Sequence, residues 1–288
     1  MKVTEVLPLK TLLGEGALWN YQTQQLYWID IENRTLFILN PATNNNTAIK
    51  MKSRIGTVVP TREGNILVAL EDGIYHFNLQ DHAMEKIADP EPGNNGNRFN
   101  DGKCDPTGRF WVGSMSLAGK SNQGALYRID HDFKVKKMID GVTTSNGIVW
   151  SLDKSKMYYI DTRTRKVVGY EYDNASGEIS NPRDAILVPE SLGKPDGSTI
   201  DAEGMLWIAM WGGGCVTRWN PDSGELLLKI DVPALNVTSC AFGGENLDIL
   251  FITTASIHMN GMEDRYPQAG KLFQVIPGVK GIRVNLFR

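Results

Sequence analysis

Apolar and polar residues alternate along this chain in a pattern that recurs six times. The clearest pair of copies is EGALWNYQTQQLYWIDI from Glu15 and NGIVWSLDKSKMYYIDT from Asn146. Both have a polar residue, a glycine, a short apolar segment, a polar turn and an aromatic-rich segment, which together predict a β-hairpin. Further copies of this pattern begin at Ile55, Asp101, Asp196 and Ser239.

The spacing of these six anchor residues predicts the fold. Successive anchors lie 40, 46, 45, 50 and 43 residues apart, and the second half of each period holds two more segments with strand patterning. Four strands in 40–50 residues are typical of one blade of a β-propeller. The sequence therefore predicts an all-β protein, a six-bladed β-propeller of four-stranded blades around a central channel, with residues 1–288 as a single domain.

The two ends of the chain are expected to meet in the last blade. The segment KVTEVLPL, which begins at Lys2, precedes the first copy of the repeat and is expected to complete the sixth blade. Closing the ring in this way covers a strand edge that would otherwise be exposed. Two strands are also expected within GKLFQVIPGVKGIRV, residues 270–284.

The anchor residues are expected to surround the channel, because the innermost strand of every propeller blade runs along it. Three carboxylates and one amide would then converge, from Glu15, Asp101, Asp196 and Asn146. Carboxylates packed together repel unless their pKa values rise or a cation binds. Oxygen donors favour one hard divalent ion, with Ca²⁺ expected first and Mg²⁺, Mn²⁺ or Zn²⁺ as alternatives. Asp-Gly and Asn-Gly pairs are also common in turns, so a single anchor indicates no more than a turn.

Arg98 and Asn100 stand just before the Asp101 anchor, in the segment NGNRFNDGK. An arginine beside acidic residues is consistent with a structural salt bridge. At the mouth of a metal-binding channel it is equally consistent with binding of a polar substrate or a developing oxyanion. Both interpretations of Arg98 stay open from the residues alone.

Other polar and aromatic residues are weaker candidates for catalysis or metal binding. Asp30 and Asp161, at the ends of the YWID and YYID segments, are interpreted as structural. Trp19 and Trp211 are interpreted as core residues within reach of a pocket. The four histidines show no ligand spacing and are interpreted as structural or surface residues: His76, His82, His131 and His258.

Composition and charge exclude several classes of partner. The 288 residues carry 30 basic and 33 acidic side chains, a net charge of −3, without a basic cluster that would bind nucleic acid or an anionic membrane. No apolar run reaches the roughly 18 residues of a membrane span, and the first residues lack the pattern of a signal peptide. Three widely spaced cysteines predict buried free thiols and a cytoplasmic location: Cys104, Cys215 and Cys240. A monomer or a small homo-oligomer is expected.

Several motifs, in order over nearly the whole chain, resemble the SMP-30/gluconolactonase/regucalcin family. They are GEGALW, RFNDGKCDPTGRFWVGSM, GALYRID, SNGIVWSLDKSKMYYID, PDGSTIDAEGMLWIA and TSCAFGG. The resemblance implies a six-bladed propeller that hydrolyses sugar lactones with one divalent metal. It also implies metal ligands at Glu15, Asn146 and Asp196, and substrate contacts at the residues of the R-x-N-D-G motif: Arg98, Asn100 and Asp101.

One segment departs from the animal members of that family. They have a longer loop after the GSM-like strand, with a glutamate that helps to shape the substrate pocket. Here the segment SLAGKSNQGALY, from Ser116, is shorter and holds no acidic residue. In this respect the chain looks more like bacterial sugar lactonases, so the substrate preference of the animal enzymes is not expected to carry over.

The expected reaction is metal-assisted hydrolysis of a sugar lactone to its sugar acid. Asp196 is the first candidate for the general base that deprotonates a water molecule, and Asp101 is the second. Two alternatives stay open. One is an esterase or organophosphate hydrolase on the same scaffold, and the other is a non-enzymatic calcium-binding propeller.

Overall fold

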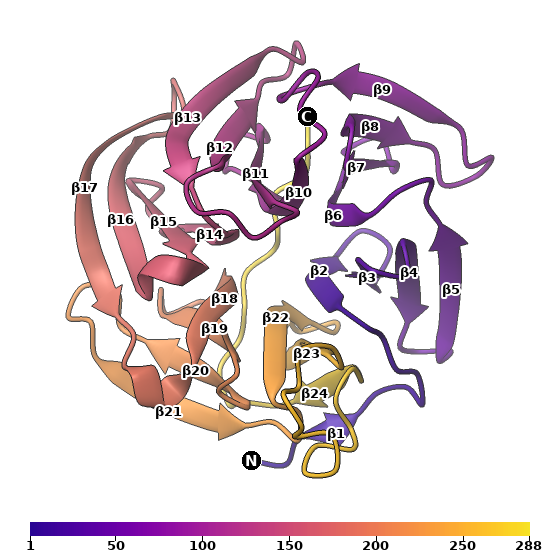
Figure 1. The fold of residues 1–288 in the computed structure, drawn as a ribbon, viewed down its shortest axis with the longest axis vertical. Helices are drawn as coiled ribbons and strands as arrows, with labels where there is room; N and C mark the ends of the chain where they lie inside the picture. The colour runs from indigo at the N-terminus through magenta and orange to yellow at the C-terminus, as the bar shows by residue number, and fades with distance from the viewer.

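Six four-stranded antiparallel sheets stand around a central channel in the computed structural model, which describes all 288 residues (Figure 1). The first two blades are β2 (Gly14–Asn20), β3 (Gln25–Asp30), β4 (Thr35–Asn40), β5 (Asn45–Lys50), and β6 (Ile55–Pro60), β7 (Ile66–Leu70), β8 (Gly73–Phe77), β9 (Met84–Ala88). The third and fourth are β10 (Asn97–Cys104), β11 (Phe110–Ser116), β12 (Gly124–Ile129), β13 (Val135–Val142), and β14 (Ser145–Trp150), β15 (Lys156–Asp161), β16 (Lys166–Asp173), β17 (Glu178–Leu187). The fifth is β18 (Lys194–Ile200), β19 (Leu206–Trp211), β20 (Cys215–Trp219), β21 (Leu226–Asp231). The predicted six-bladed propeller is therefore confirmed.

The sixth blade joins the two ends of the chain. It contains β22 (Asn236–Gly243), β23 (Ile249–Ala255), β24 (Phe273–Val275) and the N-terminal β1 (Thr4–Glu5), which pairs antiparallel with β24. The predicted closure of the ring by the N-terminal segment is confirmed. The chain has only two helices, both short 3₁₀ turns, η1 (Thr162–Thr164) and η2 (Glu190–Leu192). Neither is long or apolar enough to cross a membrane.

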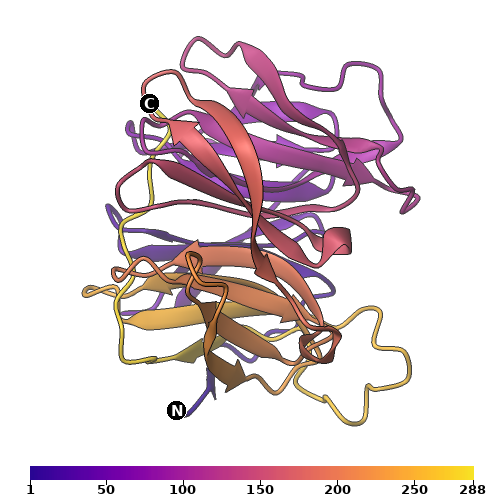
Figure 2. The ribbon, with the colours of Figure 1, turned by 90° about the vertical axis from the view of Figure 1, so that its left-hand side faces the viewer.

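The prediction of two strands within residues 270–284 is wrong, because only β24 forms there. β1 already occupies the free edge of β24, so no edge is left for a second strand. The rest of the chain instead crosses one face of the propeller, where Gly281 bridges Asp201 and Phe287 bridges Thr61. Figure 2 shows this C-terminal segment in yellow on the opposite face from the long loop between β23 and β24.

Apolar burial holds the blades together. The second strands of the first, third and fifth blades each carry a fully buried tryptophan: Trp28, Trp111 and Trp207. The inner strands are buried almost throughout, whereas the outermost strands expose most of their residues. All three cysteines are buried and free, as predicted.

A β-bulge recurs at or directly beside the anchor in all six inner strands, where the pairing with the second strand shifts register. The glycine after the anchor lets the neighbouring inner strand approach. A Cβ on Gly147 would lie 2.9 Å from the carbonyl oxygen of Asp196, and one on Gly197 would lie 2.7 Å from Oγ of Ser239. The Asp-Gly and Asn-Gly pairs therefore lie inside strands, and the interpretation of these pairs as turns is wrong.

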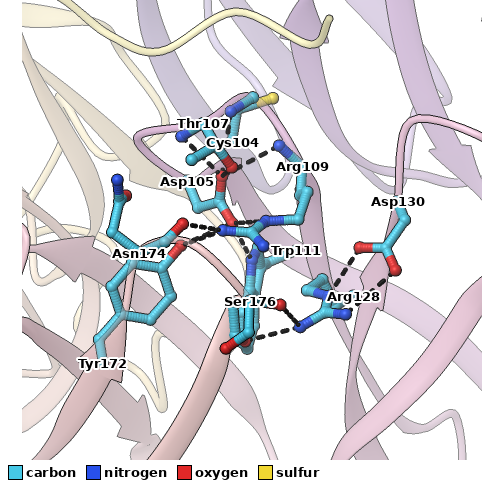
Figure 3. Close-up of polar contacts among 12 residues, drawn as sticks. Cys104, Asp105, Thr107, Arg109, Trp111, Arg128, Asp130, Tyr172, Asn174 and Ser176 are labelled. Atoms are coloured by element: carbon cyan, nitrogen blue, oxygen red, sulfur yellow. Dashed lines mark hydrogen bonds and ion pairs between the residues drawn. The ribbon is translucent and has the colours of Figure 1, made fainter.

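At the other end of the inner strands, a second set of aspartates, which includes Asp105 and Asp201, organises the hairpin turns. Figure 3 shows Asp105 and its partners. Asp105 is fully buried and accepts hydrogen bonds from the backbone N–H of Thr107 and Arg109 at 3.0 Å. Its other oxygen accepts from Arg109 Nε at 2.6 Å, Trp111 Nε1 at 3.0 Å and the Tyr172 hydroxyl at 2.8 Å. Because Tyr172 belongs to the fourth blade, this carboxylate ties the third and fourth blades together.

Candidate active site

A cavity of about 430 Å³ opens at the channel mouth, on the face where the inner strands begin. Its lining includes five of the six residues that the sequence predicts for the site: Glu15, Arg98, Asn100, Asn146 and Asp196. These residues come from four different blades, so the repeat brings together side chains up to 181 positions apart. The three predicted metal ligands all face this cavity.

Asn146 is held in one orientation by a chain of hydrogen bonds. The hydroxyl of Thr162 donates to the carbonyl oxygen of Pro195 at 2.8 Å, so it must accept from Nδ2 of Asn146, at 2.7 Å. The amide oxygen of Asn146 therefore points the other way, where it accepts from Nδ2 of Asn100 at 3.0 Å. The side of the Asn146 amide that faces Asn100 therefore carries the oxygen rather than the N–H groups.

Glu15 and Asp196 are buried carboxylates with few partners. Burial and the nearby Asp101 raise the pKa of Glu15 to about 8, although a hydrogen bond from its neighbour Gly16 at 2.9 Å opposes the shift. Burial, followed by the charges of Glu15 and Asp101, raises the pKa of Asp196 well above its usual value. One oxygen of Asp196 has no hydrogen-bond partner. A cation at this point would relieve both the repulsion and the missing contact.

Asp101 lies in the channel but does not line the cavity. One of its oxygens accepts from the backbone N–H of Gly102 at 2.7 Å, and the other is buried without a partner. Burial raises its pKa, and the positive charge of Lys103 opposes that shift. Lys103 itself donates to the carbonyl oxygen of Ser198 in the fifth blade. The substrate contact of Asp101 stays a prediction, and this residue lies outside the cavity lining.

Arg98 and Asn100 form one unit at the cavity wall. Arg98 donates to the amide oxygen of Asn100 at 2.5 Å and to the carbonyl oxygen of Phe99 at 3.1 Å. Asn100 in turn donates to the carbonyl oxygen of Ser145 at 2.6 Å as well as to Asn146. Arg98 forms no salt bridge, so the interpretation of this residue as one half of a structural ion pair is wrong. Burial lowers the pKa of its guanidinium from the ordinary arginine value, and the nearby carboxylates of Glu15 and Glu32 oppose that shift.

Several residues of the cavity were not predicted. His258, interpreted from the sequence as structural or surface, lines the cavity beside Trp211, with their ring centroids 6.2 Å apart. Thr162, Arg163 and Lys194 also line it. Trp19 does not approach the cavity; it is buried and stacks on Phe251.

Asp30 and Asp161 have the structural role that their sequence context predicts. The Asp30 carboxylate accepts from the backbone N–H groups of Leu12 and Leu13, at 2.9 and 3.2 Å. Asp161 does the same for Thr143 and Thr144, at 2.9 Å each. Both aspartates therefore fix the segment that leads into an inner strand and so position the anchor that follows it.

The chain matches a known family over most of its length. The model of the SMP-30/Gluconolactonase/LRE-like region matches residues 13–256. The chain belongs to this family. A Bacillus subtilis (strain 168) protein named "Putative sugar lactone lactonase YvrE" is 42% identical over 266 residues, which cover 92% of this chain and 91% of that relative. Regucalcin of Xenopus laevis is 34% identical, over 96% of this chain and 94% of its own length.

Solved structures of the family superpose closely on this fold. A luciferin-regenerating enzyme aligns with a TM-score of 0.94 at 34% identity, over 100% of this chain and 99% of that one. A regucalcin from Agrobacterium tumefaciens str. C58, described as a calcium-binding protein, aligns with a TM-score of 0.93 at 28% identity, over 99% and 96% of the two chains. Both the family assignment and the blade count of this chain therefore agree with the sequence-based expectation.

The donor set of the cavity fits a hard divalent ion. Glu15 and Asp196 offer carboxylate oxygens, one of them without a partner, and Asn146 offers an oriented amide oxygen. No group of three or more His, Cys, Asp and Glu side chains in the chain is placed to hold a metal, so the three predicted carboxylates do not form such a group and the candidate donors are two carboxylates and one amide. Three protein oxygens leave room for solvent or substrate oxygens in the coordination shell.

Proposed function

We propose that this protein hydrolyses a sugar lactone to its sugar acid with one divalent metal ion, Ca²⁺ first, held by Glu15, Asn146 and Asp196. The observation that carries the proposal is the group of two underpaired buried carboxylates beside an oriented amide oxygen, at the mouth of a cavity. The family of the chain and the name of its Bacillus subtilis relative support the same reaction class.

When bound, the ion would supply a Lewis acid that polarises the lactone carbonyl and stabilises the oxyanion. The chain's own residues do the rest. Asp196 is the first candidate for general base, because it lines the cavity and has a carboxylate oxygen without a hydrogen-bond partner. It would take a proton from the water that attacks the carbonyl carbon. The bond from that carbon to the ring oxygen then breaks, and the ring oxygen leaves as a hydroxyl group by taking that proton back from Asp196, which restores the carboxylate.

Arg98 and Asn100 would hold the substrate. The Arg98 guanidinium is anchored by Asn100 and lacks a carboxylate partner, so its free N–H groups can donate to sugar hydroxyls or to developing negative charge. Asp101 stays the second candidate for general base. Its position outside the cavity lining favours Asp196.

The polar lining of the cavity favours a sugar over the two alternatives. Six of its 19 lining residues are hydrophobic, and an aryl ester or organophosphate would prefer a more apolar wall. A non-enzymatic calcium-binding propeller needs no arginine held beside the ligand group. Three buried free cysteines support a reducing, cytoplasmic setting, and we expect a monomer or small homo-oligomer.

A metal add-back assay tests the proposal. Protein stripped with chelator is assayed against a panel of aldonolactones by proton release, with Ca²⁺, Mg²⁺, Mn²⁺ and Zn²⁺ returned singly and spontaneous opening subtracted. Hydrolysis should return with at least one ion and disappear in Asp196→Asn. Asp132→Asn, an exposed aspartate in the turn after β12, serves as the matched control and should keep full activity. Folded protein that turns over no lactone with any ion would refute the proposal.

A further inference from the structure

We propose that the substrate of this cavity is a lactone that carries an anionic group away from the reacting ester, and that Lys194 and Arg163 bind that group. The inference rests on the proposed lactonase function and adds a substrate class to it. It starts from the charges that line the cavity, which are more positive than hydrolysis of a neutral lactone requires.

Charges in the lining do not balance. The lining holds four cations, Arg54, Arg98, Arg163 and Lys194, and three acids, Glu15, Glu32 and Asp196. Glu15 and Asp196, when ionised, neutralise a divalent ion. Glu32 is already bound to Arg54 at 3.0 Å, and Arg54 also binds Glu71 at 2.9 Å.

Three cations are therefore left without an acidic partner. Arg98 is held by Asn100 and the Phe99 carbonyl oxygen, and we have assigned it to the reacting end of the substrate. The side chains of Lys194 and Arg163 form neither a salt bridge nor a hydrogen bond, whereas those of Arg54 and Arg98 form hydrogen bonds. Arg165, close to Arg163 in the chain, donates to the Gly193 carbonyl oxygen at 2.6 Å.

Both free cations stand on fixed backbone. Lys194 is the first residue of β18, two positions before Asp196, and pairs with Trp211 of β19. Arg163 is in η1, which Asp161 caps by accepting its backbone N–H at 3.3 Å. The same turn carries Thr162, the residue that orients Asn146. The two cations therefore flank the metal ligands of the fourth and fifth blades, with Lys194 half-buried and Arg163 exposed.

The third blade contributes no acidic residue to the cavity lining. The end of β11 contributes Met115, Ser116 and Leu117 to the lining, and the short loop that follows holds no acidic residue. A carboxylate on that wall would repel an anionic substrate. Neutral hydroxyl groups gain little from a lysine that a water molecule could not also supply, whereas an anionic group gains a charge-assisted hydrogen bond. The unpaired cations therefore select for charge rather than for sugar shape.

Matched pairs of lactones test the inference. D-glucaro-1,4-lactone, which carries a carboxylate, is compared with D-glucono-1,4-lactone. 6-phospho-D-glucono-1,5-lactone is compared with D-glucono-1,5-lactone, all with the ion that the add-back assay selects. The kcat/KM ratio of anionic to neutral lactone should exceed about 10 in at least one pair, the gain expected of one charge-assisted hydrogen bond. The two pairs also distinguish a carboxylate from a phosphate. Ratios at or below one in both pairs would overturn the inference.

Two variants assign the effect to these residues. Lys194→Met should lower the ratio about 10-fold, and Arg163→Gln about 3-fold because its side chain is exposed. The control is Arg62→Gln, an arginine without a salt bridge that follows β6 at the opposite end of the channel, and it should leave the ratio unchanged. A ratio that stays the same in both cavity variants would refute the assignment, and the exposed position of Arg163 guards against a folding defect in that variant.

A binding measurement distinguishes the failure of the anionic subsite from the failure of the proposed lactonase function. If no lactone were hydrolysed, 6-phospho-D-gluconate and D-gluconate can still be compared by isothermal titration calorimetry. Binding of the phosphorylated acid at least 10-fold tighter, lost in Lys194→Met, would support the anionic subsite without lactonase activity. Equal binding of the two acids would overturn the subsite as well.

Discussion

Two sets of buried aspartates, at opposite ends of the same inner strands, behave in opposite ways. Asp105 and Asp201, at the turn after the inner strand, are fully buried with every oxygen hydrogen-bonded (Figure 3 shows Asp105). Asp101 and Asp196, at the channel end, each have an oxygen with no partner. Burial disfavours the charged carboxylate in both places, so the difference lies in what compensates it.

The comparison separates carboxylates that hold the fold from carboxylates that the fold leaves underpaired. Burial alone would raise the pKa of Asp105, but hydrogen bonds from Trp111 and Tyr172, with the charge of Arg109, lower it overall. Burial raises the pKa of Asp196, and neighbouring acids raise it further. A low pKa in a saturated site indicates structure, and a raised pKa in an underpaired cluster indicates a function.

The largest expected effect is a loss of stability when Asp105 or Asp201, the aspartates that hold the hairpin turns, is replaced. Asp105→Ala should lower the free energy of unfolding by about 3–5 kcal/mol, because it leaves Arg109 buried without its carboxylate. Urea denaturation measures this loss. Asp201→Ala, at the equivalent position of the fifth blade, should show the same direction with a smaller loss, because Arg218 keeps Glu203 as a second partner. A loss below about 1 kcal/mol for Asp105→Ala would contradict the distinction.

The underpaired carboxylates at the channel end, Glu15 above all, should make the stability of the metal-free protein depend on pH. The pKa of Glu15 is raised to about 8 from an ordinary value near 4.5, so the folded state binds more protons than the unfolded state between these values. Stability from this group is complete below pH 4.5 and is lost as the pH rises through 8. The free energy of unfolding without metal should therefore fall by a few kcal/mol between about pH 5 and pH 9.

Glu15→Gln is the control for that pH dependence, because it keeps the shape and removes the titration. The slope of the free energy of unfolding against pH should flatten in this variant. Saturating Ca²⁺ should flatten it in the unmodified protein as well, since an ionised Glu15 then has a partner. An unchanged slope in Glu15→Gln would show that other groups govern the pH dependence.

A moderate effect is expected for the residue that orients Asn146. Thr162→Val keeps the side-chain shape but removes the hydroxyl that fixes the amide, so metal affinity should fall about 10–100-fold. Calorimetric titration with Ca²⁺ measures it. Thr164→Val in the same 3₁₀ turn, whose hydroxyl bonds only the Asp161 carbonyl oxygen and the backbone N–H of Lys166, should retain the affinity. Equal affinities of the two variants would exclude an orienting role.

The repeat in the sequence is enough to predict the blades and the inner-strand anchors, because both depend on local patterning. It does not reveal the cavity wall. Trp211, which was expected within reach of a pocket, lies at the end of a second strand, which returns to the same face as the anchors. Thr162 and His258 come just after the end of such a strand. That position could have identified them, but their residue types share no motif. In the segment KGIRV, from Lys280, polar and apolar residues alternate as in a strand. The segment still forms no strand, because β1 already pairs with the free edge of β24.

The smallest effect concerns Asp101, the channel aspartate outside the cavity lining. Asp101→Asn keeps the oxygen that accepts from Gly102 and removes a charge beside Glu15 and Asp196, so the metal-free protein at pH 8 should gain about 1 kcal/mol of stability. Urea denaturation measures the gain, and the same variant compares the two candidate bases. If Asp196 is the base, Asp101→Asn should lower kcat far less than Asp196→Asn does. A loss of kcat as complete as that of Asp196→Asn, from a protein that is more stable, would transfer the role of base to Asp101.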